Sequence, residues 1–225
     1  MKYVVSRYNH DITWLASYTS DAIIYDRSPE PIKGSIVVPN IGSDIYDKLS
    51  FIIDNYDNLP EVALYTKANI YKYITQEEFH HIKDNQTFTP ILSKQHPETM
   101  CDMKLCKQLG VAVKPFSFYD EGMYYELNYP AYLATHPVKN QIDIMNNDIN
   151  TVMKWFLNLR IMKDLKLDKL EYIPFAPGSN YILPKANILK HPKKFYQKLR
   201  NYLKWSAYPG EAMICERGLY LLWKD

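Results

Sequence analysis

The chain has 225 residues, 47% of them hydrophobic, and a formal net charge of +2. This length can bury a sizeable core within one domain, and the near-neutral charge argues against bulk affinity for nucleic acid. The three cysteines are too sparse for a disulfide framework and indicate a reducing compartment. Because no apolar run is long enough to cross a bilayer and the chain starts with a strand-like segment, we expect a cytoplasmic protein without a transmembrane segment. Peripheral contact with a membrane stays open.

Short apolar runs alternate with segments of helical spacing over residues 1–70. The runs at residues 3–7, 22–25 and 62–65 are typical of strands covered on both faces, as in parallel sheets. A short helix is expected at residues 12–18 and a longer one after Ser43. This alternation predicts an α/β domain with a mostly parallel central sheet flanked by helices. Neither GxGxxG nor a Walker sequence occurs, so a dinucleotide enzyme or a P-loop kinase is not expected.

Residues 37–69 form the stretch around which the chain is organised. Asn40 to Gly42 is predicted to be a turn, Ser43 a helix cap, and Pro60 the end of that helix. A buried strand then follows at residues 62–65. The helical stripe that would pack against the sheet consists of Ile45, Leu49, Ile52, Ile53 and Tyr56.

Polar side chains stand at both strand junctions of this stretch. Asn40 and Asp44 follow the first strand, and Lys67 and Asn69 follow the second. In open α/β sheets the ligand crevice lies beyond the carboxyl ends of the strands. These four residues are therefore expected to border one crevice, although helix capping alone would also explain Asp44.

The rest of the chain has weaker signals. Thr75 and Glu78 have the spacing of a capping box, which predicts a helix start. Residues 84–145 show little periodicity apart from a strand-like run at 124–127, so an irregular middle region is expected. Further helices are expected at about 147–163, from Pro192 and at 211–223, with a loop at 172–180 and a strand at 181–183. The helix from Pro192 has a basic face that either is solvated or meets phosphates: Lys193, Lys194, Lys198, Arg200 and Lys204.

Four segments carry a resemblance to a known family. They read VSRYNHDITWL at residues 5–15, PNIGSD at 39–44, IDNYDNLPE at 53–61, and GSNYI followed by PKKFY within 178–196. They resemble the motifs ARYNED..WL, PNxGRE, IENYDDLPD and G..F.V......RP..FY of an uncharacterised family of glycosyltransferase-like proteins, which is related to the GT-A nucleotide-sugar transferases. Glu216 and Arg217 resemble the start of its ERLW motif. Three positions depart from the pattern, since His10 replaces Glu, Ser43 replaces Arg and Gly218 interrupts ERLW.

The resemblance implies a GT-A-like single domain, with residues 1–70 as the nucleotide-binding half and residues 71–225 as the elaborated, acceptor-binding half. It implies a glycosyltransferase that moves a sugar from a nucleotide-sugar donor to a glycan or lipid-linked acceptor, in surface polysaccharide or glycan synthesis. A non-catalytic sugar- or nucleotide-binding protein of the same fold is the first alternative. A nucleic-acid-binding protein that uses the basic helix face is the second, and the near-neutral charge argues against it.

The resemblance also implies a divalent cation, and the sequence departs from that expectation. In GT-A enzymes the strand at the place of residues 62–66 ends in a DxD pair, whose carboxylates hold Mn²⁺ or Mg²⁺ on the donor diphosphate. Here Lys67, Ala68 and Asn69 follow the strand, with no carboxylate. Lys67 could neutralise the diphosphate directly, metal ligands could lie elsewhere, or the fold could serve binding alone. Adjacent His80 and His81 lack metal-ligand spacing, as do the cysteines around residues 101–106.

The expected site residues follow from the resemblance and from the strand ends. Glu216 is the candidate catalytic base or stabilising charge, unless it only pairs with Arg217 on a helix surface. Arg7, Asn9 and Asp11 end the first strand and would contact the nucleotide, unless local backbone hydrogen bonds explain them. The complete set expected to bind substrate is Arg7, Tyr8, Asn9, Asp11, Tyr25, Asn40, Gly42, Asp44, Lys67, Asn69, Ser179, Asn180 and Arg217.

Overall fold

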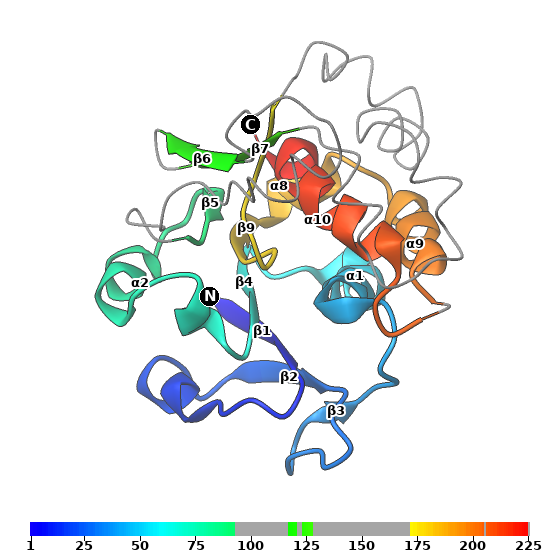
Figure 1. Ribbon diagram of the computed structural model, residues 1–225. Helices are drawn as coiled ribbons and strands as arrows, with labels where there is room; N and C mark the ends of the chain where they lie inside the picture. Colours follow the sequence, from blue (N-terminus) through cyan, green and yellow to red (C-terminus); the bar gives the residue numbers. More distant parts are fainter. Residues whose placement is uncertain (93–116, 121–122, 128–171, 205, 225) are drawn as a thin grey trace, which may run out of the picture.

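The computed structural model describes residues 1–92, 117–120, 123–127, 172–204 and 206–224 (Figure 1). Its centre is a six-stranded sheet with the order β3-β2-β1-β4-β9-β5. The strands expected at residues 3–7, 22–25, 62–65 and 181–183 are confirmed. The strands of this sheet are β1 Lys2–Arg7, β2 Ala22–Asp26, β3 Ile36–Val37, β4 Val62–Lys67, β5 Thr89–Pro90 and β9 Tyr181–Pro184.

The sheet is mixed, so the prediction of a mostly parallel sheet is wrong for the sheet as a whole. β3, β2, β1 and β4 pair in parallel, but β9 runs antiparallel to both β4 and β5. The physical reason is that residues 181–183 are an apolar run buried in the sheet, and such a run has the same pattern in either direction. Direction is set by the route of the chain into the strand.

Helices cover both faces of this sheet, as the sequence predicted (Figure 1). Alternate side chains of β1 point to opposite faces, so that Val4 packs in one buried cluster with Leu49 and Trp223, and Val5 packs in another with Phe79. The first cluster joins the sheet to α1 Ser43–Asp54, α9 Lys193–Tyr202 and α10 Gly210–Trp223. The second joins it to α2 Gln76–Ile82 and to the short helices η1 Thr13–Ser17 and η3 Ile70–Lys72.

A second, three-stranded antiparallel sheet has the order β6-β7-β8, with β6 Ser117–Asp120, β7 Met123–Leu127 and β8 Tyr172–Phe175. β7 confirms the strand expected at residues 124–127. The loop expected at 172–180 is wrong for its first four residues, because these form β8 and pair with β7. A short helix that the sequence did not predict, α8 Lys185–Leu189, follows β9. The helix expected at about 147–163 and most of the irregular middle region lie outside the described residues.

Within the described residues, capping signals predict two helix starts, and one of them is confirmed. Thr75 and Glu78 form a reciprocal capping box at the start of α2. At α1, however, the N-cap is Gly42 with a φ of 65°, and Ser43 is the first helical residue. Glycine is required there because a Cβ on residue 42 would lie 2.7 Å from the Cβ of Tyr46 and 2.9 Å from the Cβ of Leu203. Within the described residues, no helix is long and apolar enough to cross a membrane.

Candidate functional site

The strand order reverses between β1 and β4, and a cavity opens at this point. From β1 the chain runs to β2 and β3 on one side, and α1 brings it back to β4 on the other. Ligand crevices of open α/β sheets lie at such reversals, beyond the carboxyl ends of the strands. A cavity of about 150 Å³ lies here, and the residues that line it include Ser6, Arg7, Asp44, Lys67, Asn69 and Tyr73. We call it the switch-point cavity.

Asp44, in the first turn of α1, is the centre of a buried charge cluster. Its Oδ2 accepts hydrogen bonds from Lys48 Nζ at 2.5 Å and from Ser179 Oγ at 2.6 Å, and its Oδ1 lies 3.1 Å from Lys67 Nζ. Burial alone would raise the pKa of Asp44, but the ammonium groups of Lys48 and Lys67 hold it well below its usual range. The carboxylate is therefore ionised and already paired with two cations.

The two lysines of the cluster differ in exposure and in role. Lys48 is completely buried; burial lowers its pKa, and the carboxylate of Asp44 opposes this change. The side chain of Lys67 is 25% exposed and lines the cavity. Burial would lower the pKa of Lys67, but Asp44 and Glu216 raise it above its usual value. Lys67 thus presents a permanent positive charge at the end of β4.

A three-residue loop, 178–180, connects the cluster to α10 and β4. Gly178 and Ser179 have φ values of 81° and 51°, so the loop turns sharply. The N–H of Gly178 donates to Glu216 Oε1 at 2.5 Å, and Lys48 Nζ donates to the carbonyl oxygen of Ser179 at 2.7 Å. Asn180 Oδ1 accepts from the N–H of Lys67 at 2.9 Å. The loop therefore fixes the end of β4 and the base of the cavity.

Two further ion pairs involve arginines of the cavity lining, Arg7 and Arg27. Arg7 donates to Asp26 Oδ2 at 2.7 Å and to the carbonyl oxygen of His10 at 2.9 Å, which fixes the loop after β1. Arg27 pairs with Asp47, whose side chain is fully buried. Burial raises the pKa of Asp47 to about 6, although Arg27 acts to lower it. Within the described residues, Asp47 Oδ1 has no hydrogen-bond partner.

The chain matches a family model over nearly its whole length. The match covers residues 3–223, and the family is described as "Protein of unknown function (DUF3431)". The chain belongs to the DUF3431 family. No curated protein matches the chain, and no solved structure matches it. The DUF3431 match names no activity, so the resemblance to GT-A transferases stays a prediction.

The structure brings many of the sequence-predicted residues of this DUF3431 chain to one place. Arg7, Tyr8, Asp44, Lys67 and Asn69 line the switch-point cavity. Ser179, Asn180 and Glu216 connect to it through the hydrogen bonds already described, and Gly42 is the N-cap of α1, whose first turn holds Asp44.

Five other predicted residues of the DUF3431 chain do not line that cavity. Asn9 is exposed with a φ of 56°, and Asp11 accepts hydrogen bonds from Thr13 in a neighbouring, larger cavity. Tyr25 is buried in the core, and Arg217 is buried with its guanidinium 4.8 Å from the ring centre of Phe175. Asn40 is half-buried, and its Oδ1 has no hydrogen-bond partner in the described part of the chain.

Sequence reasoning missed several residues of the site. Lys48 had a usable signal, because it lies four residues after Asp44 beside the apolar stripe of α1, where a charge needs a partner. Tyr73 and Tyr208 line the cavity but carried no signal, since they reach it through loops whose course the sequence pattern does not specify.

The DUF3431 site does not fit a divalent cation at the end of β4. Asp44 is the acidic residue on the cavity lining, and its oxygens already face two ammonium groups, which would repel a metal ion. In the described ranges, no group of three or more His, Cys, Asp or Glu side chains could hold a metal ion.

The basic face of α9 is partly neutralised, since Lys193 pairs with Asp57 and Arg200 with Asp54.

Proposed function

We propose that this protein is a GT-A-like glycosyltransferase whose switch-point cavity binds the diphosphate of a nucleotide-sugar donor. The observation that carries the proposal is the position of Lys67 on the lining of a cavity at the strand-order reversal between β1 and β4. Nucleotide-binding α/β folds place their ligand at this reversal, and a diphosphate there needs a positive charge near the strand end. The acceptor class is a glycan or a lipid-linked saccharide.

The charges on the cavity lining support an anionic donor. Three basic side chains, Arg7, Arg27 and Lys67, and one carboxylate, Asp44, line the cavity, and carboxylates outside the lining pair with Arg7 and Arg27. Lys67 acts as a point charge on the diphosphate, because it lies on the cavity lining and Asp44, at 3.1 Å, holds its ammonium group in place. Donor binding in this arrangement does not require a divalent cation at the end of β4.

Glu216 and His10 have different roles in the proposed reaction. Glu216 accepts the N–H of Gly178 and lies 3.7 Å from Arg217, which favours a positioning role for the loop at 178–180. His10 is exposed and lines both the switch-point cavity and the larger cavity beside it. In a direct displacement, an imidazole nitrogen of His10 accepts the proton of the acceptor hydroxyl, whose oxygen bonds to the anomeric carbon. The bond from that carbon to the diphosphate breaks, and the nucleoside diphosphate leaves with the electron pair.

A non-catalytic nucleotide-sugar-binding protein is the second candidate. Asp44, the carboxylate that lines the cavity, is held by two lysines and by Ser179, so it is a poor proton acceptor. This favours binding without turnover if His10 is not used as the base.

The test combines a thermal-shift screen with an assay for nucleoside diphosphate release. UDP-glucose, UDP-galactose, UDP-N-acetylglucosamine and GDP-mannose are added to the wild type, to Lys67→Ala and to Lys194→Ala, which removes an exposed lysine of α9. At least one donor should raise the melting temperature of the wild type and of Lys194→Ala, but not of Lys67→Ala. Release that His10→Gln abolishes while donor binding persists supports the transferase, and binding without release supports the second candidate. If no donor shifts the wild type, the proposal fails.

A further inference from the structure

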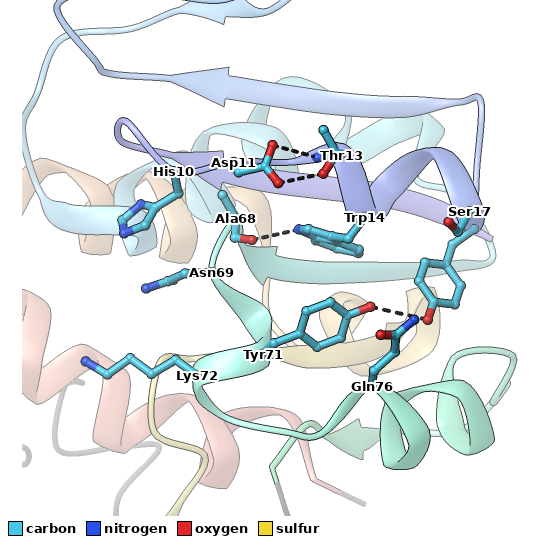
Figure 2. A pocket seen from close by; sticks show the side chains of 11 residues that line it. His10, Asp11, Thr13, Trp14, Ser17, Ala68, Asn69, Tyr71, Lys72 and Gln76 are labelled. Carbon is cyan, nitrogen blue, oxygen red and sulfur yellow. Dashed lines mark hydrogen bonds between the residues drawn. The ribbon is translucent and has the colours of Figure 1, made fainter.

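A second and larger cavity of about 580 Å³ lies beside the switch-point cavity (Figure 2). It is formed between the loop after β1 with η1 and the segment that leads from β4 through η3 to α2. His10 and Asn69 line both cavities, so the two are neighbours along the carboxyl edge of the sheet. Its volume lies in the range of about 300–1,000 Å³ that is usual for small-molecule sites.

One wall of this cavity is aromatic, and contacts with neighbouring residues hold its rings in place. The Trp14 and Tyr71 side chains lie side by side along this wall (Figure 2), with ring centres 5.8 Å apart at an angle of 61°. Both rings contact Phe79, which is fully buried. Trp14 Nε1 donates to the carbonyl oxygen of Ala68 at 2.7 Å, which fixes the indole. Tyr71 is 37% exposed. Aromatic rings that are rigid and partly exposed offer an apolar surface to a ligand with little loss of conformational entropy.

The remaining wall is polar and carries balanced charge. Gln76 and Asn69 offer amide donors and acceptors, while Lys72 and Asp11 contribute opposite charges that cancel. The side chain of Gln76 is exposed, and no hydrogen bond joins it to the described residues. This lining differs from that of the switch-point cavity, which has three basic side chains and one carboxylate. It suits a neutral ligand with many hydroxyl groups and apolar C–H faces.

We propose that the larger cavity is a saccharide-binding groove that takes a neutral oligosaccharide through Tyr71, Trp14 and Gln76. Its assignment as the acceptor site rests on the proposed function, because the shared residues His10 and Asn69 would then place an acceptor hydroxyl next to the donor. A nucleobase could also stack on the aromatic wall. The balanced charge and the separation from the cationic cavity favour the saccharide.

Saccharide binding is measured without any nucleotide, by saturation-transfer NMR and by the fluorescence of the tryptophans, and UDP and GDP are titrated in separate samples. Maltotriose, cellotriose, chitotriose and mannotriose serve as probes, at concentrations up to about 10 mM because weak millimolar binding is expected for neutral sugars. The variants are Tyr71→Ala and Gln76→Ala, both at exposed positions, and urea unfolding checks that each variant is folded. Tyr71→Phe removes only the hydroxyl that donates to Tyr18 and keeps the ring. Gln86→Ala, at an exposed glutamine outside the groove, is the matched control for Gln76→Ala.

At least one trisaccharide should bind the wild type, Tyr71→Phe and Gln86→Ala with similar affinity. Tyr71→Ala should weaken that binding about tenfold or more, as expected when a stacking ring is removed. The inference is overturned if no trisaccharide binds, if Tyr71→Ala binds as the wild type does, or if Tyr71→Ala weakens the binding of UDP and GDP instead. Donor binding is measured separately, in the thermal-shift screen with nucleotide sugars. If the protein binds a trisaccharide but no donor, the proposed function alone is refuted. If it binds a donor but no trisaccharide, the groove alone is refuted.

Discussion

Replacement of Asp44 by Asn should destabilise the protein strongly, because it removes the carboxylate partner of a buried ammonium group. Lys48 is completely buried, and Asp44 Oδ2 lies 2.5 Å from its Nζ. Lys48 Nζ also donates to the carbonyl oxygen and the hydroxyl of Ser179, but these groups carry no charge. Removing one partner of a buried ion pair destabilises proteins by about 3–5 kcal/mol. For a chain of this size that corresponds to a loss of about 6–20 °C in melting temperature.

The reverse substitution, Lys48→Met, should destabilise the protein less than Asp44→Asn. Without Lys48, the carboxylate of Asp44 still has the Lys67 ammonium at 3.1 Å and two hydroxyl donors, Ser43 and Ser179. The double variant Asp44→Asn with Lys48→Met should recover part of the loss, since no unpaired buried charge remains.

Urea unfolding at neutral pH measures these differences as changes in midpoint at constant slope. The control is Asp57→Asn, which removes a carboxylate that is 79% exposed and 3.4 Å from Lys193, and it should change the unfolding free energy by less than about 1 kcal/mol. If Asp44→Asn lies as close to the wild type as this control, Lys48 is not a buried charge that depends on Asp44.

Three further predictions concern pH dependence, packing and the loop at 178–180. The raised pKa of Asp47, about 6, means that its contribution to stability is fully present below about pH 4 and is lost as the pH rises through 6. The unfolding free energy of the wild type minus that of Asp47→Asn, measured by urea unfolding, should therefore fall between about pH 4 and pH 6. A rise over this interval would show that Asp47 is ionised in the native state. Gly42→Ala should lower the unfolding free energy by about 1–3 kcal/mol more than Gly34→Ala, because both residues have positive φ but, of the two, residue 42 is the crowded one. Equal losses would contradict the close contacts of residue 42 with Tyr46 and Leu203. Gly178→Ala should weaken donor binding in calorimetry, because the new Cβ would lie 2.6 Å from the Cζ of Tyr73 on the cavity lining; unchanged affinity would separate the loop from the cavity.

The sequence predicts the N-terminal half of the sheet well, because the signals there are local. Apolar runs specify β1, β2 and β4, and helical spacing specifies α1. The rule that ligands lie at the carboxyl ends of strands then puts Arg7, Asp44 and Lys67 near one another, and all three line the switch-point cavity.

Local sequence patterns do not predict how the C-terminal residues contribute to the site. The loop at 178–180 meets α1 across more than a hundred residues of sequence, and no local pattern encodes that contact. Ser179 and Asn180 were expected to bind substrate, but their hydrogen bonds show how they support Asp44 and the end of β4. The direction of β9 was missed for a related reason, since burial on both faces looks the same for parallel and antiparallel strands.

Calorimetry with the donor that gives the largest thermal shift tests most directly whether Lys67 holds a diphosphate without a divalent cation. Titrations of the wild type and of Lys67→Ala are run at matched salt, each with and without a chelator. A charge-assisted contact of this kind contributes about 1.5–3 kcal/mol, so Lys67→Ala should weaken donor affinity about tenfold to a hundredfold, while the chelator leaves wild-type affinity unchanged. Donor binding that the chelator abolishes and that Lys67→Ala does not alter would show instead that a metal ion holds the diphosphate.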